Sequence, residues 1–294
     1  MKTFATALTA TAAIFWTAPL FAQNDAFGRD PADPVSSFAL RDKADNKQYH
    51  MVVPAAGQRD ERCMSGTNLC FSVIRADPGA DPQLRIRDAV RPGAAGEEAV
   101  PIDLDALAKG LELSIWPLAI RRTPFEEADA AGESMFIGVL ARERFVYSGG
   151  YAHLSSLWLY RVDNAGTGKA VVRQILSVPF DAGQSLRACF NERDALRRAD
   201  ACLNETKLET TLLLDEANDD PMPKLVYRTS FRSYPGDIPL RAPGEEPDQI
   251  TESDKVWAQH SACSYSRNLA WNPATARYEF DRPAPDCRLF GLER

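Results

Sequence analysis

Hydrophobic and polar residues alternate along most of this chain. The clearest alternation runs through residues 224–234, where one set of alternate positions holds Leu225, Tyr227, Thr229 and Phe231 and the other set is mostly charged or polar. A period of two places the two sets on opposite faces of a β-strand. We therefore predict a strand with one dry face and one wet face, as in an antiparallel sheet.

Turn-forming residues separate further segments of this kind. Segments 265–271 and 276–280 flank the Asn-Pro-Ala-Thr sequence of residues 272–275, which predicts a hairpin. Residues 148–154 contain two glycines and are interpreted as a connection. The other predicted strands cover residues 70–75, 83–88, 134–140, 144–147, 156–162, 169–178 and 209–214. The expected fold is mainly β, an antiparallel, hairpin-built sandwich or barrel-like domain, with a small β-propeller as the alternative.

Helical patterns are few. Residues 102–111 contain an aspartate of the kind that caps the N-terminus of a helix and a glycine of the kind that ends one. They therefore predict one short helix. Residues 190–201 predict a second, with Asn191 as its N-cap and acidic residues in its first turn. Cys189 and Cys202 bracket this second segment, so we expect a stapled helix.

The six cysteines fall into three sequential pairs, each bracketing one local unit: Cys63 and Cys70, Cys189 and Cys202, and Cys263 and Cys287. Their spacings differ from the Cys-x2-Cys type of zinc sites. An even number of cysteines behind an export signal indicates disulfides. We predict nearest-neighbour pairing, although spacing alone leaves the connectivity open.

The first 22 residues have the pattern of a signal peptide, with Lys2 before an apolar stretch and Ala22 at a small-residue cleavage site. Cleavage there leaves 294 − 22 = 272 residues, which we divide into a flexible arm (23–37) and one disulfide-stapled β domain (38–294). The expected location is periplasmic or secreted. No later apolar run approaches the length of a membrane span, so no membrane insertion is expected.

The formal charge is −7, and it becomes −8 without Lys2. An acidic protein is a poor electrostatic partner for nucleic acid, so we expect no nucleic-acid ligand. A protein or glycan ligand in the cell envelope is the expected kind of partner.

Candidate catalytic residues are Ser148 and His153, since a serine nucleophile needs a base within hydrogen-bond reach and nearby glycines offer N–H donors to an oxyanion. Paired glycines between strands are also typical of a structural turn.

One acidic turn is a candidate calcium site because it offers several oxygen ligands. Its ligand candidates are Asp215, Glu216, Asn218, Asp219 and Asp220. The turn lacks the spacing of an EF-hand loop, and a solvated hairpin turn is the competing interpretation. No other cofactor is predicted.

Trp257 follows a proline-rich stretch (233–253) and is the best candidate for an exposed binding aromatic, with Tyr234 and His260 nearby in sequence. Trp158 and Trp271 lie in alternating segments and are predicted to be core residues. Two functions remain open. The first is a non-catalytic envelope or secreted protein that binds a protein, glycan or other ligand. The alternative is a secreted hydrolase with catalytic residues dispersed on loops.

Overall fold

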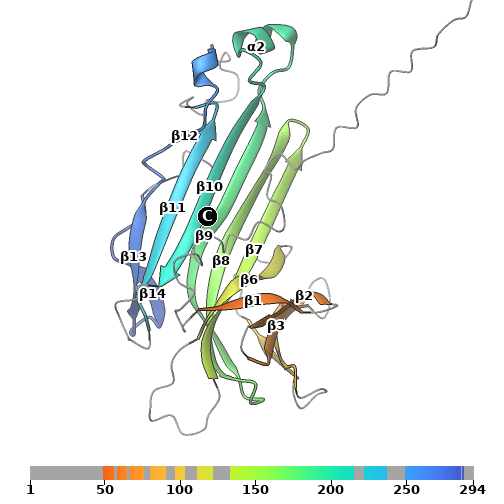
Figure 1. Ribbon diagram of the computed structural model, residues 1–294, viewed down its shortest axis with the longest axis vertical. Helices are drawn as coiled ribbons and strands as arrows, with labels where there is room; N and C mark the ends of the chain where they lie inside the picture. Colours follow the sequence, from red (N-terminus) through yellow and green to blue (C-terminus); the bar gives the residue numbers. More distant parts are fainter. Residues whose placement is uncertain are drawn as a thin grey trace, which may run out of the picture.

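The computed structural model describes residues 49–55, 58–64, 67–75, 80–90, 97–102, 111–121, 133–214, 222–236, 249–285 and 287. The predicted signal peptide, the arm, the 102–111 helix and the acidic turn at 215–220 lie wholly or almost wholly outside these ranges. Within them the chain is mainly antiparallel β, as predicted (Figure 1). The strands are β1 (Tyr49–Ala55), β2 (Gln58–Met64), β3 (Leu69–Ile74), β4 (Gln83–Asp88), β5 (Glu97–Pro101), β6 (Glu112–Arg121), β7 (Glu133–Tyr147), β8 (Gly150–Ala165), β9 (Val171–Arg187), β10 (Leu203–Leu214), β11 (Leu225–Tyr234), β12 (Ala258–Gln259), β13 (Ser266–Asn272) and β14 (Arg277–Phe280).

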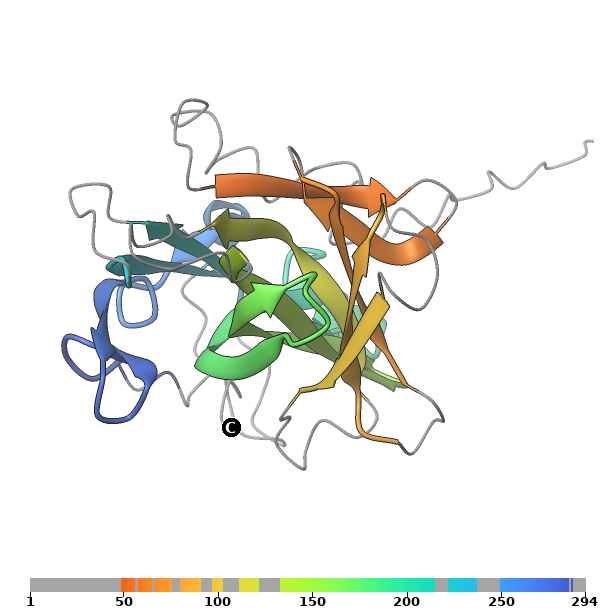
Figure 2. The same cartoon turned by 90° about the horizontal axis from the view of Figure 1, so that it is seen from below.

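The described strands form one continuous order, β14-β13-β11-β10-β9-β8-β7-β6-β1-β2-β3-β4-β5, with β12 paired to β11. The two ends of this order, β14 and β5, do not pair with each other, so the described strands do not close into a barrel. Strands β1–β5 lie across the lower part of the long strands (Figure 1), which gives a two-layered, sandwich-like arrangement (Figure 2). The order contains no separate four-stranded blades of the kind a propeller needs.

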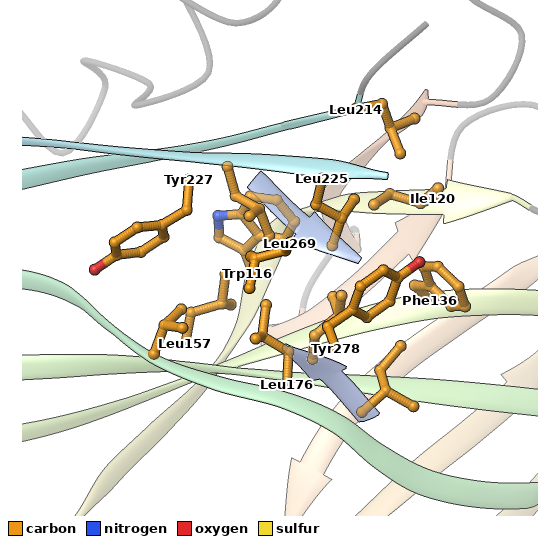
Figure 3. Close-up of a cluster of buried hydrophobic side chains, with 14 of the residues drawn as sticks. Trp116, Ile120, Phe136, Leu157, Leu176, Leu214, Leu225, Tyr227, Leu269 and Tyr278 are labelled. Carbon is orange, nitrogen blue, oxygen red and sulfur yellow. The ribbon is translucent and has the colours of Figure 1, made fainter. Parts of the chain in front are cut away.

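The first core cluster fills the space between these layers. It joins Phe71 of β3 and Ile86 of β4 to Ile137 of β7 and Tyr160 of β8, all almost fully buried. The second cluster lies on the opposite face of β6–β9, beneath β10, β11, β13 and β14 (Figure 3).

Residues 135–139 of β7 therefore contact core on both faces. Met135 and Ile137 belong to the first cluster and Phe136 to the second, and all three are inaccessible to solvent. A strand buried on both faces reads as a continuous apolar run, which is the pattern that these residues show. Trp158 is buried and Trp271 packs against the second cluster, so both tryptophans lie in or against the core as predicted.

Three disulfides connect Cys63 to Cys70, Cys189 to Cys202, and Cys263 to Cys287, which confirms nearest-neighbour pairing. They indicate an oxidising environment. The Cys63–Cys70 bridge joins directly opposite residues of β2 and β3.

The long strands extend beyond their predicted limits. Residues 148–154 were expected to be a connection, but the turn contains Ser148 and Gly149 alone and β8 begins at Gly150. The predicted strands 134–140 and 144–147 are one strand, β7, because its polar middle keeps pairing with β8. Polar residues there interrupt the apolar pattern without interrupting the main-chain hydrogen bonds.

Helix is scarce in the described ranges. The helix α2 (Glu192–Arg197) is capped as predicted, since the Asn191 side chain accepts a hydrogen bond from the N–H of Asp194. A short 3-10 helix, η2 (Glu252–Asp254), precedes β12. No described helix combines the length and the apolar character needed to cross a bilayer.

Candidate functional site

The upper end of the long sheet brings together parts of the chain that are distant in sequence. The connection between β9 and β10 carries α2, and the segment leading into β12 carries η2 beside it (Figure 1). The N–H of Ile250 donates to the carbonyl oxygen of Arg197 at 3.0 Å, which ties the two connections together. We call this region the distal end.

The α2 connection is held firmly. The Cys189–Cys202 disulfide closes it at its base, and the N–H of Ala188 donates to the carbonyl oxygen of Cys202 at 2.9 Å. Arg198 is buried, and its guanidinium donates to the carbonyl oxygen of Ala201 and to the Asn204 side chain. A short helix is unstable by itself, so these contacts maintain its position.

Large hydrophobic side chains are exposed at this end. Five of them form what we call the distal surface: Phe190 (69% exposed), Leu196 (76%), Leu203 (42%), Val256 (55%) and Trp257 (38%). The guanidinium of Arg187 lies 5.5 Å from the Phe190 ring centre, and Arg187 is the register partner of Leu203. Of these five residues, only Trp257 is predicted from the sequence to be an exposed binding aromatic. The other four are ordinary apolar residues in sequence, and only their exposure distinguishes them.

Trp257 is packed into an aromatic and charged group. Its ring centre lies 5.8 Å from that of Tyr234, and the Lys207 ammonium nitrogen lies 5.1 Å from the same tryptophan ring. Glu205, the register partner of Tyr234, completes the group. Burial raises the pKa of the Glu205 carboxyl, while the charge of Lys207 acts in the opposite direction. Two of the predicted binding residues, Tyr234 and Trp257, thus lie together.

The third, His260, lies on the other side of β11. Its Nε2 is 2.6 Å from the Ser233 hydroxyl, and its ring centre is 5.5 Å from that of Phe231. Residues 231 and 233 alternate with Tyr234 along the strand, so they face away from Trp257. His260 therefore contributes to the packing beneath the sheet rather than to the distal surface.

The two candidate catalytic residues are separated. Ser148 is exposed in the turn between β7 and β8, and His153 lies on β8, about 10 Å along the strand from Gly150. His153 instead pairs with Asp181 of β9, with Nε2 and Oδ2 3.0 Å apart and both side chains mostly buried.

Ordinary strand alternation places Asp181 on the same face as His153, because His153 pairs with Gly183, two residues from Asp181. Ser155 pairs with Asp181 and Ser156 with Pro179, which leaves Phe180 as the extra residue of β9. This bulge begins beyond the Ser155–Asp181 pair, so it does not alter how His153 and Asp181 face each other. The nearby Ser155 is almost inaccessible to solvent, and its hydroxyl accepts a hydrogen bond from Arg142 at 3.1 Å. His153 and Asp181 therefore form a hydrogen-bonded pair beside a serine hydroxyl that is almost inaccessible to solvent.

The described residues also contain a group with metal-ligating side chains, Glu61, Cys63 and Cys70. Both sulfur atoms are consumed in a disulfide, and the Glu61 carboxylate is bound to Arg87. Metal ligation by cysteine requires the thiolate, so this group does not fit a metal ion. The candidate calcium ligands at residues 215–220 lie outside the described ranges.

We compared the chain with protein-family models, curated proteins and solved structures, and none of the three comparisons found a match.

Proposed function

We propose that this protein is a periplasmic or secreted, non-catalytic module that binds another protein through the distal surface. The observation that carries the proposal is the gathering of five exposed large hydrophobic side chains on one disulfide-stapled end. Exposed apolar groups that cluster on a soluble domain are typical of interaction sites, whereas scattered ones need no explanation.

The composition of the surface favours a protein ligand. Aromatic residues and arginine are enriched in protein interfaces. The distal surface contains Phe190 and Trp257, and the Arg187 guanidinium lies over the Phe190 ring, 5.5 Å from its centre. The stapled α2 connection reduces the ordering cost of binding, because its side chains are presented on a fixed backbone.

Site-specific photo-crosslinking in the native host tests this proposal. A photoreactive phenylalanine analogue replaces Leu196 or Val256 in the full chain. The matched controls carry it at Val90 (65% exposed) or Val171 (40%), two exposed hydrophobic residues that lie away from the distal end. We expect the same protein adduct at Leu196 and Val256 and none at the controls.

A second variant checks that the adduct reports specific docking. Leu196→Asp places a charge in the surface without touching the core, so it should abolish the Val256 adduct while leaving the circular dichroism spectrum unchanged. Absence of any protein adduct at both distal positions, or equal adducts at the controls, would overturn the proposal.

A further inference from the structure

Beside the distal surface, strands β10, β11 and β12 present a polar face. Register pairs across these strands place two rows of three side chains on one side of the sheet. Trp257 immediately precedes β12, and its ring contact with Tyr234 continues the pairing of Ser233 with Ala258 by one position. We call the six residues the strand face: Glu205, Tyr234 and Trp257 in the first row, and Lys207, Arg232 and Gln259 in the second.

The strand face is accessible to solvent. Gln259 is exposed, Trp257 is 38% exposed, and the side chain of Arg232 is 40% exposed. The other three residues are half-buried. The face extends about 10 Å across the three strands and about 7 Å along them. It is therefore large enough for a small ligand or for a short part of a polymer.

Several polar groups of the strand face have no side-chain hydrogen bond to the described part of the chain. Arg232 donates from Nη2 to Glu209 at 3.0 Å, but its buried Nε has no acceptor among the described residues. The Glu205 carboxylate accepts no hydrogen bond from a described residue, and burial raises the pKa of this carboxyl. Polar groups that are removed from water without a partner cost free energy. A ligand that supplied the missing partners would recover that cost.

The available donors and acceptors suit a polyhydroxyl ligand. A hydroxyl group both donates and accepts hydrogen bonds, so neighbouring hydroxyls can accept from Arg232 and donate to Glu205. Hydrogen bonds to charged groups are stronger than those between neutral groups. The exposed amide of Gln259 adds one further donor and acceptor pair beside Arg232.

The aromatic pair supplies the apolar part of the site. The rings of Trp257 and Tyr234 combine apolar surface with a polar edge, which suits the C–H face of a sugar ring. The Lys207 ammonium nitrogen lies 5.1 Å from the centre of the Trp257 ring, and the Tyr234 ring centre lies 5.8 Å from it. These two neighbours hold the indole in place, which reduces the ordering cost of binding.

The charges around the strand face favour an uncharged ligand. With Glu209, the area contains two basic and two acidic side chains. An anion would lie against Glu205, and a cation would lie against Arg232 and Lys207. A purely apolar ligand would remove water from these ions without replacing its hydrogen bonds, which is unfavourable. We propose that the strand face binds a neutral glycan, as a ligand additional to the protein bound by the distal surface.

Binding measurements with the full chain test this inference. The probes are soluble neutral oligosaccharides of glucose, N-acetylglucosamine, mannose and galactose, with a heparin fragment as the anionic comparison. Saturation-transfer NMR identifies the oligosaccharide that binds, and calorimetric titration gives its dissociation constant. We expect a neutral oligosaccharide to bind more tightly than the heparin fragment. Lack of binding by every neutral probe, or tighter binding of the heparin fragment, would overturn the proposal.

Two substitutions locate the site. Glu205→Gln removes the charged acceptor, and Arg232→Met removes the guanidinium donors while keeping an extended side chain. Each should weaken sugar binding by about tenfold or more, with circular dichroism confirming that the variant folds. Glu279→Gln is the matched control, because Glu279 is an exposed carboxylate on β14. A dissociation constant that Glu205→Gln and Arg232→Met leave at the wild-type value would overturn the site.

The sugar and the protein ligand are distinguished by separate variants. Leu196→Asp should leave the sugar dissociation constant unchanged, because Leu196 lies outside the strand face. Glu205→Gln should leave the photo-adducts at Leu196 and Val256 intact. The glycan inference therefore stands or fails independently of the distal-surface proposal. Loss of those adducts in Glu205→Gln would overturn the assignment of two separate sites.

Discussion

Arg87 holds the buried carboxylate of Glu61 with two hydrogen bonds. The Nε and Nη2 atoms of Arg87 donate to the two carboxylate oxygens at 2.9 and 2.6 Å. The Glu61 side chain is 1% exposed and that of Arg87 is 30% exposed. Hydrogen bonds from Arg87 lower the pKa of Glu61 below 4.5, and burial only partly offsets them.

This pair predicts an acid-sensitive contribution to stability. Because the folded pKa of Glu61 is lowered, the contribution is present above pH 4.5 and is lost as the pH falls through the folded pKa. Urea unfolding between neutral and acidic pH should show this loss in the wild type and a flatter profile in Glu61→Gln. A Glu61→Gln profile as steep as that of the wild type would contradict the assignment.

Substitution of Arg87 should lower the free energy of unfolding more than substitution of Glu61. Arg87→Met leaves a buried carboxylate without its main donor, and breaking a buried pair in this way costs roughly 3–5 kcal/mol. We expect Arg87→Met to be less stable than Glu61→Gln at neutral pH. Adding Glu61→Gln to Arg87→Met should recover part of the lost free energy of unfolding.

Gly138 and Gly149 form a matched pair for a packing test. A Cβ at Gly138 would lie 2.7 Å from the Trp116 Cβ and 2.9 Å from a Leu157 methyl carbon. Gly138→Ala should therefore lower the free energy of unfolding by about 1–3 kcal/mol through overpacking. Gly149→Ala meets no atom within 4 Å and should be close to neutral. Thermal melts of the two variants measure the difference.

The buried hydroxyl of Tyr227 should make the stability of the folded protein decline at alkaline pH. Its hydroxyl donates to the carbonyl oxygen of Pro179 at 2.7 Å, and burial raises its pKa well above 10.0. Since the folded chain disfavours the phenolate, this contribution to stability is present below the ordinary tyrosine pKa and is lost as the pH rises above it. Tyr227→Phe should lose about 1 kcal/mol at neutral pH. It should also show a smaller alkaline decline than the wild type in pH-dependent unfolding.

The Cys189–Cys202 disulfide should act locally. Replacing both cysteines with alanine removes a constraint of about 3 kcal/mol on a short loop. Hydrogen exchange should then increase in α2, while residues 135–139 of β7 remain protected. Replacing Cys263 and Cys287 in the same way provides the control, because that bridge lies away from α2. Equal exchange of α2 in both variants would show that its position does not depend on its own bridge.

Local patterns in the sequence predicted local structure well. The alternation of residues 224–234, the 265–280 hairpin and the Asn191 cap all correspond to observed elements. The cysteine pairs were predictable because each one brackets a single local unit. These features depend on residues close together in the chain.

Features set by long-range pairing were not predictable. His153 meets Asp181 because the register of β8 and β9 pairs His153 with Gly183, two residues from Asp181. His260 and Trp257 lie on opposite faces of β11. The path of the chain around β11 decides which face each residue contacts, and no local pattern specifies that path. Within the described ranges, β6 pairs with β7 only as far as Arg142 whereas β8 pairs with it as far as Tyr147, and no pattern within β7 itself reveals the length of a neighbour.

The length of β9 has a further consequence. At 17 residues, it extends about 55 Å and carries the distal surface away from the hydrophobic clusters. The exposed residues of that surface belong to neither of the two main clusters. Substitutions in the distal surface should therefore have little effect on the free energy of unfolding of the sheet and its two hydrophobic clusters. Under the proposed binding function, substitutions at this tip would alter specificity without rebuilding the fold, as in a scaffold with an interchangeable head.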